Sequence, residues 1–381
     1  MTIQKTMTDF SKIEPYEDKD VPAAIARVVG HPMFPRLVKT LNPKIDVPTI
    51  KLMLSSIKTV LDFQRFFMGP LFSHIAHSTM TEFTTSGLEN LDRGKHYLMV
   101  SNHRDIMLDA AMVAVDMLAK GFDTPEVGFG NNLIHNDFVK DCFALNKMFV
   151  ILRGGTRREF YENSLRHSQY IRYARLEKNH SVWIAQRNGR AKNGIDHTDP
   201  ALLKMFAMSG SGDFVKDMAE LNILPVSVSY EYEPCDAQKI LETYISATEV
   251  YEKSRNEDMN SIMTGIMQPK GHVHFTYNEP ITVEELEACA QYDKNERFDK
   301  LAEVMDRRIW KGYKLHKTNY MAHDLLNSSD QYEDCYTTEQ LEEFIDYVRM
   351  RTDRWPSEGA REALRDLMLK LYANPVDSAN F

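Results

Sequence analysis

The sequence is poor in cysteine and carries no excess of positive charge. Its four cysteines, Cys142, Cys235, Cys289 and Cys335, lie far apart and form no CxxC pair. That spacing argues against a disulfide framework or a zinc site and favours a reducing compartment. The 55 acidic residues outnumber the 46 basic ones, which gives a net charge of −9. A general nucleic-acid binder needs a basic face, so we expect no nucleic-acid partner. The scattered cysteines likewise lead us to expect no bound metal.

Two further absences concern membrane spans and nucleophiles. No stretch of about 18 uncharged apolar residues is present, so the sequence predicts no transmembrane helix. The polar N-terminal segment lacks the apolar core of a signal peptide. The sequence also has no Gly-x-Ser-x-Gly motif, and none of its cysteines lies in a recognisable catalytic signature. A hydrolase with a serine or cysteine nucleophile is therefore disfavoured.

What the sequence does contain is an alternation of strand-like and helical segments. Residues 1–80 and 286–381 have helical periodicity, whereas short β-like runs alternate with helical stretches over residues 81–285. The candidate strands are His96–Ser101, Glu126–Gly130, Met148–Leu152, Ser181–Ala185, Ile223–Tyr230 and His272–Tyr277. Helical crossovers between strands predict an α/β fold with a mainly parallel sheet flanked by helices. We expect the two outer regions to be helical extensions of this central domain.

The N-terminal region holds an amphipathic segment rich in aromatic residues. Pro48 stands at a helix start, and apolar residues recur at helical spacing from Ile50 to Phe72. The end of this segment gathers aromatics beside Arg65, a composition that suits the boundary between water and hydrocarbon. A helix packed on the central domain explains the pattern equally well. The 21 methionines likewise suit either core filling or a surface for variable apolar ligands.

The first segment with chemical potential is the strand His96–Ser101 and the Asn102-His103 pair that follows it. A histidine between a strand and a helix lies at the rim where α/β folds build their sites. Asp105 is placed to cap the next helix, and Asp109 follows four residues later. A carboxylate near His103 could fix its tautomer and stabilise the imidazolium. Taken alone, the segment also fits an ordinary surface histidine beside a capping aspartate.

Two later strands end in basic loops that contain glycine. Arg153, Gly154 and Gly155 follow the strand that ends at Leu152, and Gln186, Arg187, Asn188, Gly189 and Arg190 follow the strand that ends at Ala185. Thr156 and Glu159 have the spacing of a capping box. Glycines before a helix expose backbone N–H groups to anions, and guanidinium groups match phosphate oxygens. Strand-end loops of a parallel sheet share an edge, so both loops could approach His103, although plain surface loops fit too.

A fourth segment, Ile223–Tyr230, contains Pro225, which suits the first residue of a strand, and we interpret it as structural. Taken in order, the four segments resemble those of the glycerolipid acyltransferase family, typified by lysophosphatidic acid acyltransferases. The family pattern is Asn-His followed by Asp, a strand ending in Arg, a Glu-Gly-Thr-Arg-like loop, and a strand with proline. The resemblance covers roughly residues 80 to 285, just over half of the chain.

The resemblance implies acyl transfer from acyl-CoA or acyl-carrier-protein to a hydroxyl of a glycerophosphate-type or lysolipid acceptor, foremost 1-acylglycerol-3-phosphate, in phospholipid biosynthesis. His103 would deprotonate that hydroxyl directly, with Asp109 orienting it. Arg153 and Arg190 would hold the anionic head, in a substrate site that also includes Asn102, Gly154, Gly155, Gln186, Asn188 and Gly189. The acyl donor is a co-substrate, and no other cofactor is implied. We expect a cytoplasmic protein, peripheral at the inner face of the membrane.

The chain departs from the family pattern in three places. Five residues separate His103 from Asp109, one more than the family has, so Asp105 competes as the partner of His103. Lys147 stands where the family often has glycine. The third block lacks its acidic residue, which leaves the acceptor open and admits a lyso-aminolipid. Two alternatives remain: a metal-dependent hydrolase using His103, Asp105 and Asp109, and a non-catalytic lipid-binding protein on an acyltransferase scaffold.

Overall fold

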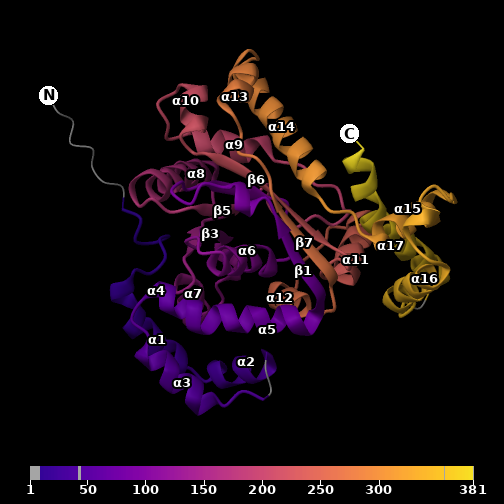
Figure 1. Ribbon diagram of the computed structural model, residues 1–381, viewed down its shortest axis with the longest axis horizontal. Coiled ribbons are helices and arrows are strands. Elements are labelled where there is room, and N and C mark those ends of the chain that lie inside the picture. Colours follow the sequence, from indigo (N-terminus) through magenta and orange to yellow (C-terminus); the bar gives the residue numbers. More distant parts are fainter. Residues whose placement is uncertain (1–8, 42–43, 356, 381) are drawn as a thin grey trace.

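The fold is built on one sheet of seven strands. The computed structural model describes residues 9–41, 44–355 and 357–380. In chain order the strands are β1 (Met80–Ser86), β2 (Leu98–Ser101), β3 (Glu126–Gly130), β4 (Met148–Ile151), β5 (Val182–Ala185), β6 (Ile223–Tyr230) and β7 (Gly271–Tyr277). Their order across the sheet is β1-β7-β6-β2-β5-β3-β4. All neighbours run parallel except β6 and β7. The predicted α/β fold with a mainly parallel sheet is confirmed (Figure 1).

Each of the six predicted strands is present within two residues of its predicted ends, whereas β1 was not predicted. β1 lies at an edge and pairs only with β7, and its Thr-rich sequence shows no clear alternation of buried and exposed residues. Pro225 is the third residue of β6 and not the first. The Pro225 carbonyl accepts a hydrogen bond from Asn278 N at 3.1 Å, just beyond the end of β7. The N–H that proline lacks would point to the same side, where no strand carbonyl needs a donor.

Helices cover both faces of the sheet. In chain order they are α1 (Val21–Gly30), α2 (Met33–Leu41), α3 (Val47–Ser56), α4 (Val60–Phe63), α5 (Gly69–Thr79), α6 (Leu108–Ala119), α7 (Asp137–Ala144), α8 (Arg157–Arg172), α9 (Pro200–Ala207), α10 (Phe214–Ala219), α11 (Asp236–Ser246), α12 (Glu257–Met267), α13 (Val283–Ala290), α14 (Glu296–Gly312), α15 (Lys317–Asn327), α16 (Thr338–Thr352) and α17 (Glu358–Ala379). One face of β2 packs with α5, α6 and α12 through Met99. The other face packs with α8, α9, α10, α13 and α14 through Leu98 and Val100. Successive side chains of a strand point to opposite faces, which produces these two cores.

The N-terminal helices form a third layer beyond α6. Their predicted continuous helix is interrupted: α3 ends at Ser56, Thr59 caps α4, and a π-helical turn, Gln64–Met68, joins α4 to α5. Phe63 and Phe72 are buried against the rest of the protein, while Phe66 is 52% exposed. Burial of these two rings supports the packed interpretation of this segment. Within the described ranges, no helix is long and apolar enough to cross a membrane.

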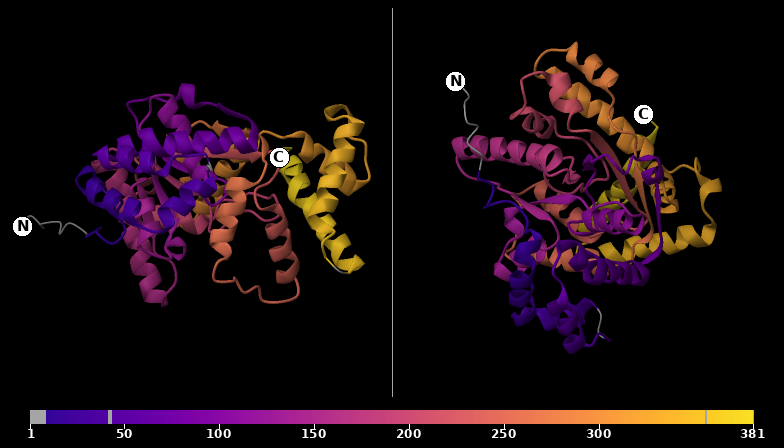
Figure 2. Two further views of the ribbon diagram at one scale, coloured as in Figure 1. Left: turned by 90° about the horizontal axis from the view of Figure 1, so that it is seen from below. Right: turned by 60° about the vertical axis from the view of Figure 1, so that its left-hand side comes forward.

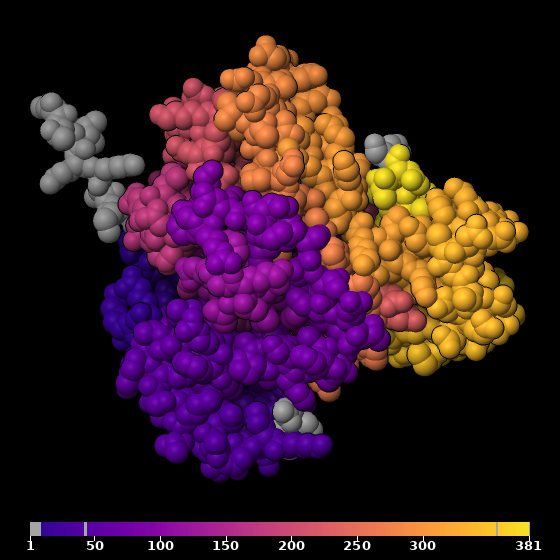
Figure 3. All heavy atoms as spheres, in the orientation of Figure 1, coloured from indigo at the N-terminus to yellow at the C-terminus, as the bar shows by residue number. Residues whose placement is uncertain are grey.

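The C-terminal helices gather beside the sheet. α11, α15, α16 and α17 share an apolar core around Phe344, Met368 and Leu371. α13 to α17 agree with the helical periodicity expected for residues 286–381, and α17 continues to Ala379. Figure 3 shows the N-terminal and C-terminal helices on separate sides of the surface. The division of the chain at residues 80 and 285 stays a prediction.

Candidate active site

His103 follows the central strand β2 at the carboxyl end of the parallel strands. Its Nδ1 lies 2.8 Å from Asp109 Oδ2, and its side chain is 15% exposed. The ring meets Trp183 of β5 edge to face, with centroids 5.9 Å apart. No group in the described part of the chain hydrogen-bonds its Nε2. The imidazole is therefore held at one nitrogen and available at the other.

Asp109 is fully buried and accepts four hydrogen bonds. Besides His103, its Oδ2 accepts from the backbone N–H groups of Arg104 (2.6 Å) and Asp105 (3.0 Å). Its Oδ1 accepts from the Tyr230 hydroxyl of β6 at 2.8 Å. These donors orient the carboxylate, which accepts the Nδ1 proton of His103 and leaves Nε2 as the basic nitrogen. The extra residue between His103 and Asp109 is accommodated because the chain turns before α6 begins.

Asp105 has a different role from Asp109. Its Oδ1 accepts from the backbone N–H groups of Met107 (2.9 Å) and Leu108 (2.8 Å), so it satisfies donors at the start of α6, although the N-cap residue is Met107. Its Oδ2 is buried without a hydrogen bond and faces Gly265 of α12, where a side chain would have no room. Burial raises the pKa of Asp105, and the neighbouring Asp109 carboxylate raises it further. Of the two candidate partners, Asp109 contacts His103.

Asn102 ties the histidine loop to β6. Its side chain accepts from Val228 N at 2.7 Å and donates to Val228 O at 2.9 Å, which mimics a strand partner. Its Nδ2 also lies 3.0 Å from Asp196 Oδ2. Asn102 is fully buried, so it holds the loop in place and offers no surface to a ligand. Among the residues described, no three His, Cys, Asp or Glu side chains are grouped to hold a metal ion.

Arg104 is the centre of a buried charge network that sequence reasoning missed. Its guanidinium pairs with Asp196 and with Glu233, the latter at 3.3 Å. Lys239 of α11 donates to Glu233 at 2.6 Å and to the Arg104 carbonyl at 2.7 Å. The positive charges of Arg104 and Lys239 balance the negative charges of Asp196 and Glu233. Charged groups that are buried need this pairing. Sequence alone gave no signal, because an arginine beside His103 is just as compatible with an exposed side chain.

The loop after β5 lies directly beside His103. Gln186 N donates to Ser101 O at 2.7 Å, and Ala191 N donates to His103 O at 2.9 Å. Gln186 is buried, whereas Asn188 and Gly189 are exposed. Arg190 is half-buried, and its Nη1 is enclosed without a hydrogen bond. The Arg190 charge acts on Asp105, where it opposes the rise in pKa that burial causes.

The loop after β4 is farther from His103 than predicted. β5 and β3 separate β4 from β2, so three strand spacings place its end roughly 14 Å away. Arg153, Gly154 and Gly155 are exposed, and the capping box of Thr156 and Glu159 is formed. Arg153 lies over Gly130 and interacts with Asp258 of α12, and Arg190 interacts with the same carboxylate. Both arginines therefore act on the carboxylate at the start of α12, but of the two loops the β5 loop is the one hydrogen-bonded to the His103 backbone.

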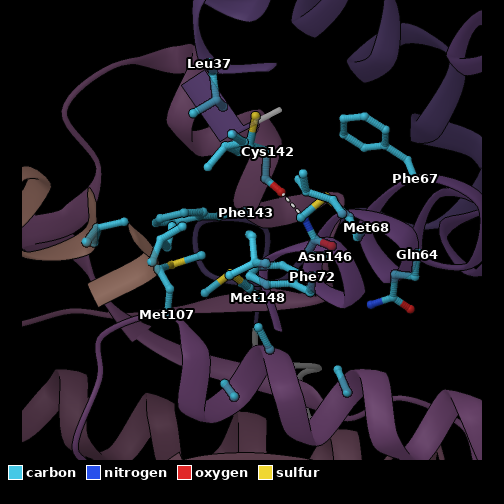
Figure 4. Close-up of a pocket in the computed structure, with 18 of the residues that line it drawn as sticks. Leu37, Gln64, Phe67, Met68, Phe72, Met107, Cys142, Phe143, Asn146 and Met148 are labelled. Carbon is cyan, nitrogen blue, oxygen red and sulfur yellow. Dashed lines mark hydrogen bonds between the residues drawn. The ribbon is translucent and has the colours of Figure 1, made fainter. Parts of the chain in front are cut away.

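An apolar cavity of about 220 Å³ lies between α6 and the N-terminal helices. Figure 4 shows part of its lining, with Met107 and Gln64 on opposite sides. One face of α6 lines it through Ala110, Ala111, Ala114, Val115 and Leu118, the spacing of a single helical stripe. The lining includes six methionines, Met33, Met68, Met107, Met148, Met259 and Met263. Ile106 and Met107 belong to the histidine loop, so the lining of the cavity begins three residues after His103.

Comparison with models of protein families and with curated proteins found no match. Among solved structures, the chain is similar to the 1-acyl-sn-glycerophosphate (LPA) acyltransferase PlsC from Thermotoga maritima. The TM-score is 0.38 at 15% identity, over 76% of this chain and 93% of that one. A similarity at this level carries no functional argument, so the function has to be argued from the site itself.

Proposed function

We propose that the chain is an O-acyltransferase that moves a fatty acyl group from a thioester donor to a hydroxyl of a lysolipid or glycerophosphate-type acceptor. One observation carries the proposal. A buried carboxylate holds Nδ1 of His103, Nε2 is left open, and an apolar cavity lined by methionines begins three residues further along the same loop. A general base beside a site for a long apolar chain suits chemistry on a lipid.

The chemistry follows from the proton positions at His103. Nε2 takes the proton of the acceptor hydroxyl while Asp109 stabilises the imidazolium through Nδ1. The hydroxyl oxygen attacks the thioester carbonyl carbon and forms the new C–O bond. The C–S bond then breaks, and the departing thiolate takes up the proton from Nε2. The base returns to its starting state, and no acyl group is ever bonded to the protein.

The cavity is the proposed site of the acyl chain. It follows α6 from Met107 to Leu118, which at 1.5 Å per residue is about 16 Å, enough for most of an extended palmitoyl chain. Each methylene that leaves water for this apolar lining contributes about 0.8 kcal/mol. The methionines suit chains of somewhat different shape because their side chains are flexible.

Arg190 is the proposed contact for the anionic head of the acceptor. Its Nη1 is enclosed without a hydrogen bond in a loop that touches His103, and a phosphate or carboxylate oxygen would satisfy it. Arg153 is a second, more distant cation for the same head. The co-substrate is acyl-CoA or acyl-carrier-protein. Acceptor candidates are 1-acylglycerol-3-phosphate first, then glycerol phosphate and lyso-aminolipids.

We propose that the protein acts at the cytoplasmic surface of a membrane. Every residue from Arg153 to Glu162 is exposed, and Figure 2 shows the first turns of α8 extending away from the sheet. This end carries Phe160 and Tyr161, which are 64% and 61% exposed, together with arginines. Aromatic rings beside cations suit the boundary of an anionic bilayer.

The test is a transfer assay with labelled acyl-CoA or acyl-carrier-protein and a panel of lyso-acceptors. We expect the wild-type protein to label at least one acceptor, and His103→Ala to lose about 100-fold or more of the rate. His74→Ala, which changes an exposed histidine of α5, is the matched control and should keep full activity. Labelled fatty acid that binds without any transfer by the wild type would contradict the proposal and favour the lipid-binding alternative.

A further inference from the structure

The apolar cavity has one buried amide that the protein leaves half satisfied. Gln64 is 5% exposed, and its Oε1 accepts from Thr124 Oγ1 at 2.7 Å. Its Nε2 has no hydrogen-bond partner in the described part of the chain, and Figure 4 shows it turned toward the cavity. This N–H donor is open to the cavity, so a ligand group that accepts from it would be favoured there over an apolar group.

Gln64 lies at the end of the cavity away from His103. A side-chain carbon at Gly69 would lie 3.1 Å from the Gln64 carbonyl and 3.8 Å from Leu118 Cδ2. Leu118 is the penultimate residue of α6, whereas the histidine loop immediately precedes that helix. Thr124 comes just before β3, at the amino-terminal end of the parallel strands, whereas His103 lies at their carboxyl-terminal end. A chain that runs from His103 along α6 therefore brings its far end to Gln64.

The local backbone aims several side chains at this end. Gln64 opens the π-helical turn that joins α4 to α5, and Gly69 N donates to Gln64 O to close it. Gln64, Phe67 and Met68 of this turn all line the cavity. Turns of this kind insert one extra residue into a helix and are frequent at functional sites. The turn thus places a polar side chain in a wall that is otherwise nearly all apolar.

A second polar group lines the same cavity. Asn146 donates its Nδ2 to Cys142 O at 2.8 Å, which leaves its Oδ1 as an acceptor without a described partner. Apart from Cys142, the remaining polar lining side chain is Thr124, which is engaged with Gln64. Asn146 is thus a second amide in the lining, with an oxygen that no described residue engages.

We infer that the far end of the cavity recognises a hydroxyl group near the distal end of a fatty acyl chain. This rests on the proposed function, which places the acyl carbonyl at His103. A hydroxyl group both donates and accepts hydrogen bonds. It can therefore pair with the free amide atom of Gln64, whether Thr124 engages the amide oxygen or the amide nitrogen. A plain chain would bury its methyl end against this open amide and leave it without a partner.

The test measures binding directly, by calorimetry on the full-length protein carrying His103→Ala, so that no transfer is needed. The probes are palmitate, its ω-hydroxy form and its β-hydroxy form. We expect the ω-hydroxy acid to bind about tenfold more tightly than palmitate, and the β-hydroxy acid to show no such gain. The double variant Gln64→Leu, Thr124→Val removes both partners of the buried hydrogen bond and should abolish the preference.

Met263→Leu changes an apolar position of the same cavity and should keep the preference for the ω-hydroxy acid. Equal or weaker binding of the ω-hydroxy acid, or a preference that survives in the double variant, overturns the inference. Absence of binding by all three acids overturns it too, together with the proposed acyl site. Selective binding without any transfer by the wild type would uphold the inference and contradict only the proposed activity.

Discussion

The loops that follow β4 and β5 look alike in sequence and differ in the structure. Both combine arginine with glycine at the carboxyl end of a parallel strand. The β5 loop is hydrogen-bonded to the His103 backbone, and its Arg190 is half-buried. The β4 loop lies at the sheet edge with Arg153 exposed. Position in the strand order, more than composition, therefore decides which basic loop belongs to the site.

The largest expected effect concerns Asp109, the buried partner of His103, whose backbone the β5 loop contacts. Replacing Asp109 with Asn removes the acceptor of the His103 Nδ1 proton and favours the wrong tautomer, so we expect the transfer rate to fall by about 10²–10⁴-fold. Asp105→Asn keeps an oxygen to cap α6 and should cost far less. Steady-state transfer rates of both variants check this, and an equal loss in the two would mean that Asp109 is not the specific partner.

A second prediction concerns the stability of the loop that carries His103. Arg104→Met leaves Asp196 and Glu233 buried without their cation, which should lower the free energy of unfolding by about 3–5 kcal/mol. The same change at exposed Arg153 should stay within about 0.5 kcal/mol of the wild type. Urea denaturation measures both. Similar unfolding midpoints for the two variants would show that the network does not stabilise the fold.

The smallest expected effect separates the two arginines as contacts for the acceptor. Arg190→Ala should raise KM for an anionic acceptor by about ten- to a hundredfold, the value of one charge-assisted hydrogen bond. Arg153→Ala should raise it only a few-fold, because that side chain is exposed and distant. Comparison of KM values for a charged and an uncharged lyso-acceptor checks this. A larger effect at Arg153 would reverse the assignment and place the anionic head at the β4 loop.

Sequence reasoning predicted the sheet because buried strands leave a strong apolar signal. It also brought together His103 and its two aspartates, which are close in the chain. It missed β1, whose threonines resemble those of a loop, and the network around Arg104, whose partners lie some 90 to 135 residues away. Strand order is likewise a long-range property, so the separation of Arg153 from His103 could not be predicted from the sequence. The cavity is formed by several helices at once, and no single segment encodes it.

The central claim is that His103 is the base for direct transfer to a lipid hydroxyl. The most direct measurement is the rate of labelled acyl transfer by purified His103→Ala beside the wild type, with fatty-acid binding measured on the same samples. We predict a loss of about 100-fold or more in transfer with binding unchanged, because the cavity does not include the imidazole. Full turnover by His103→Ala would contradict the account.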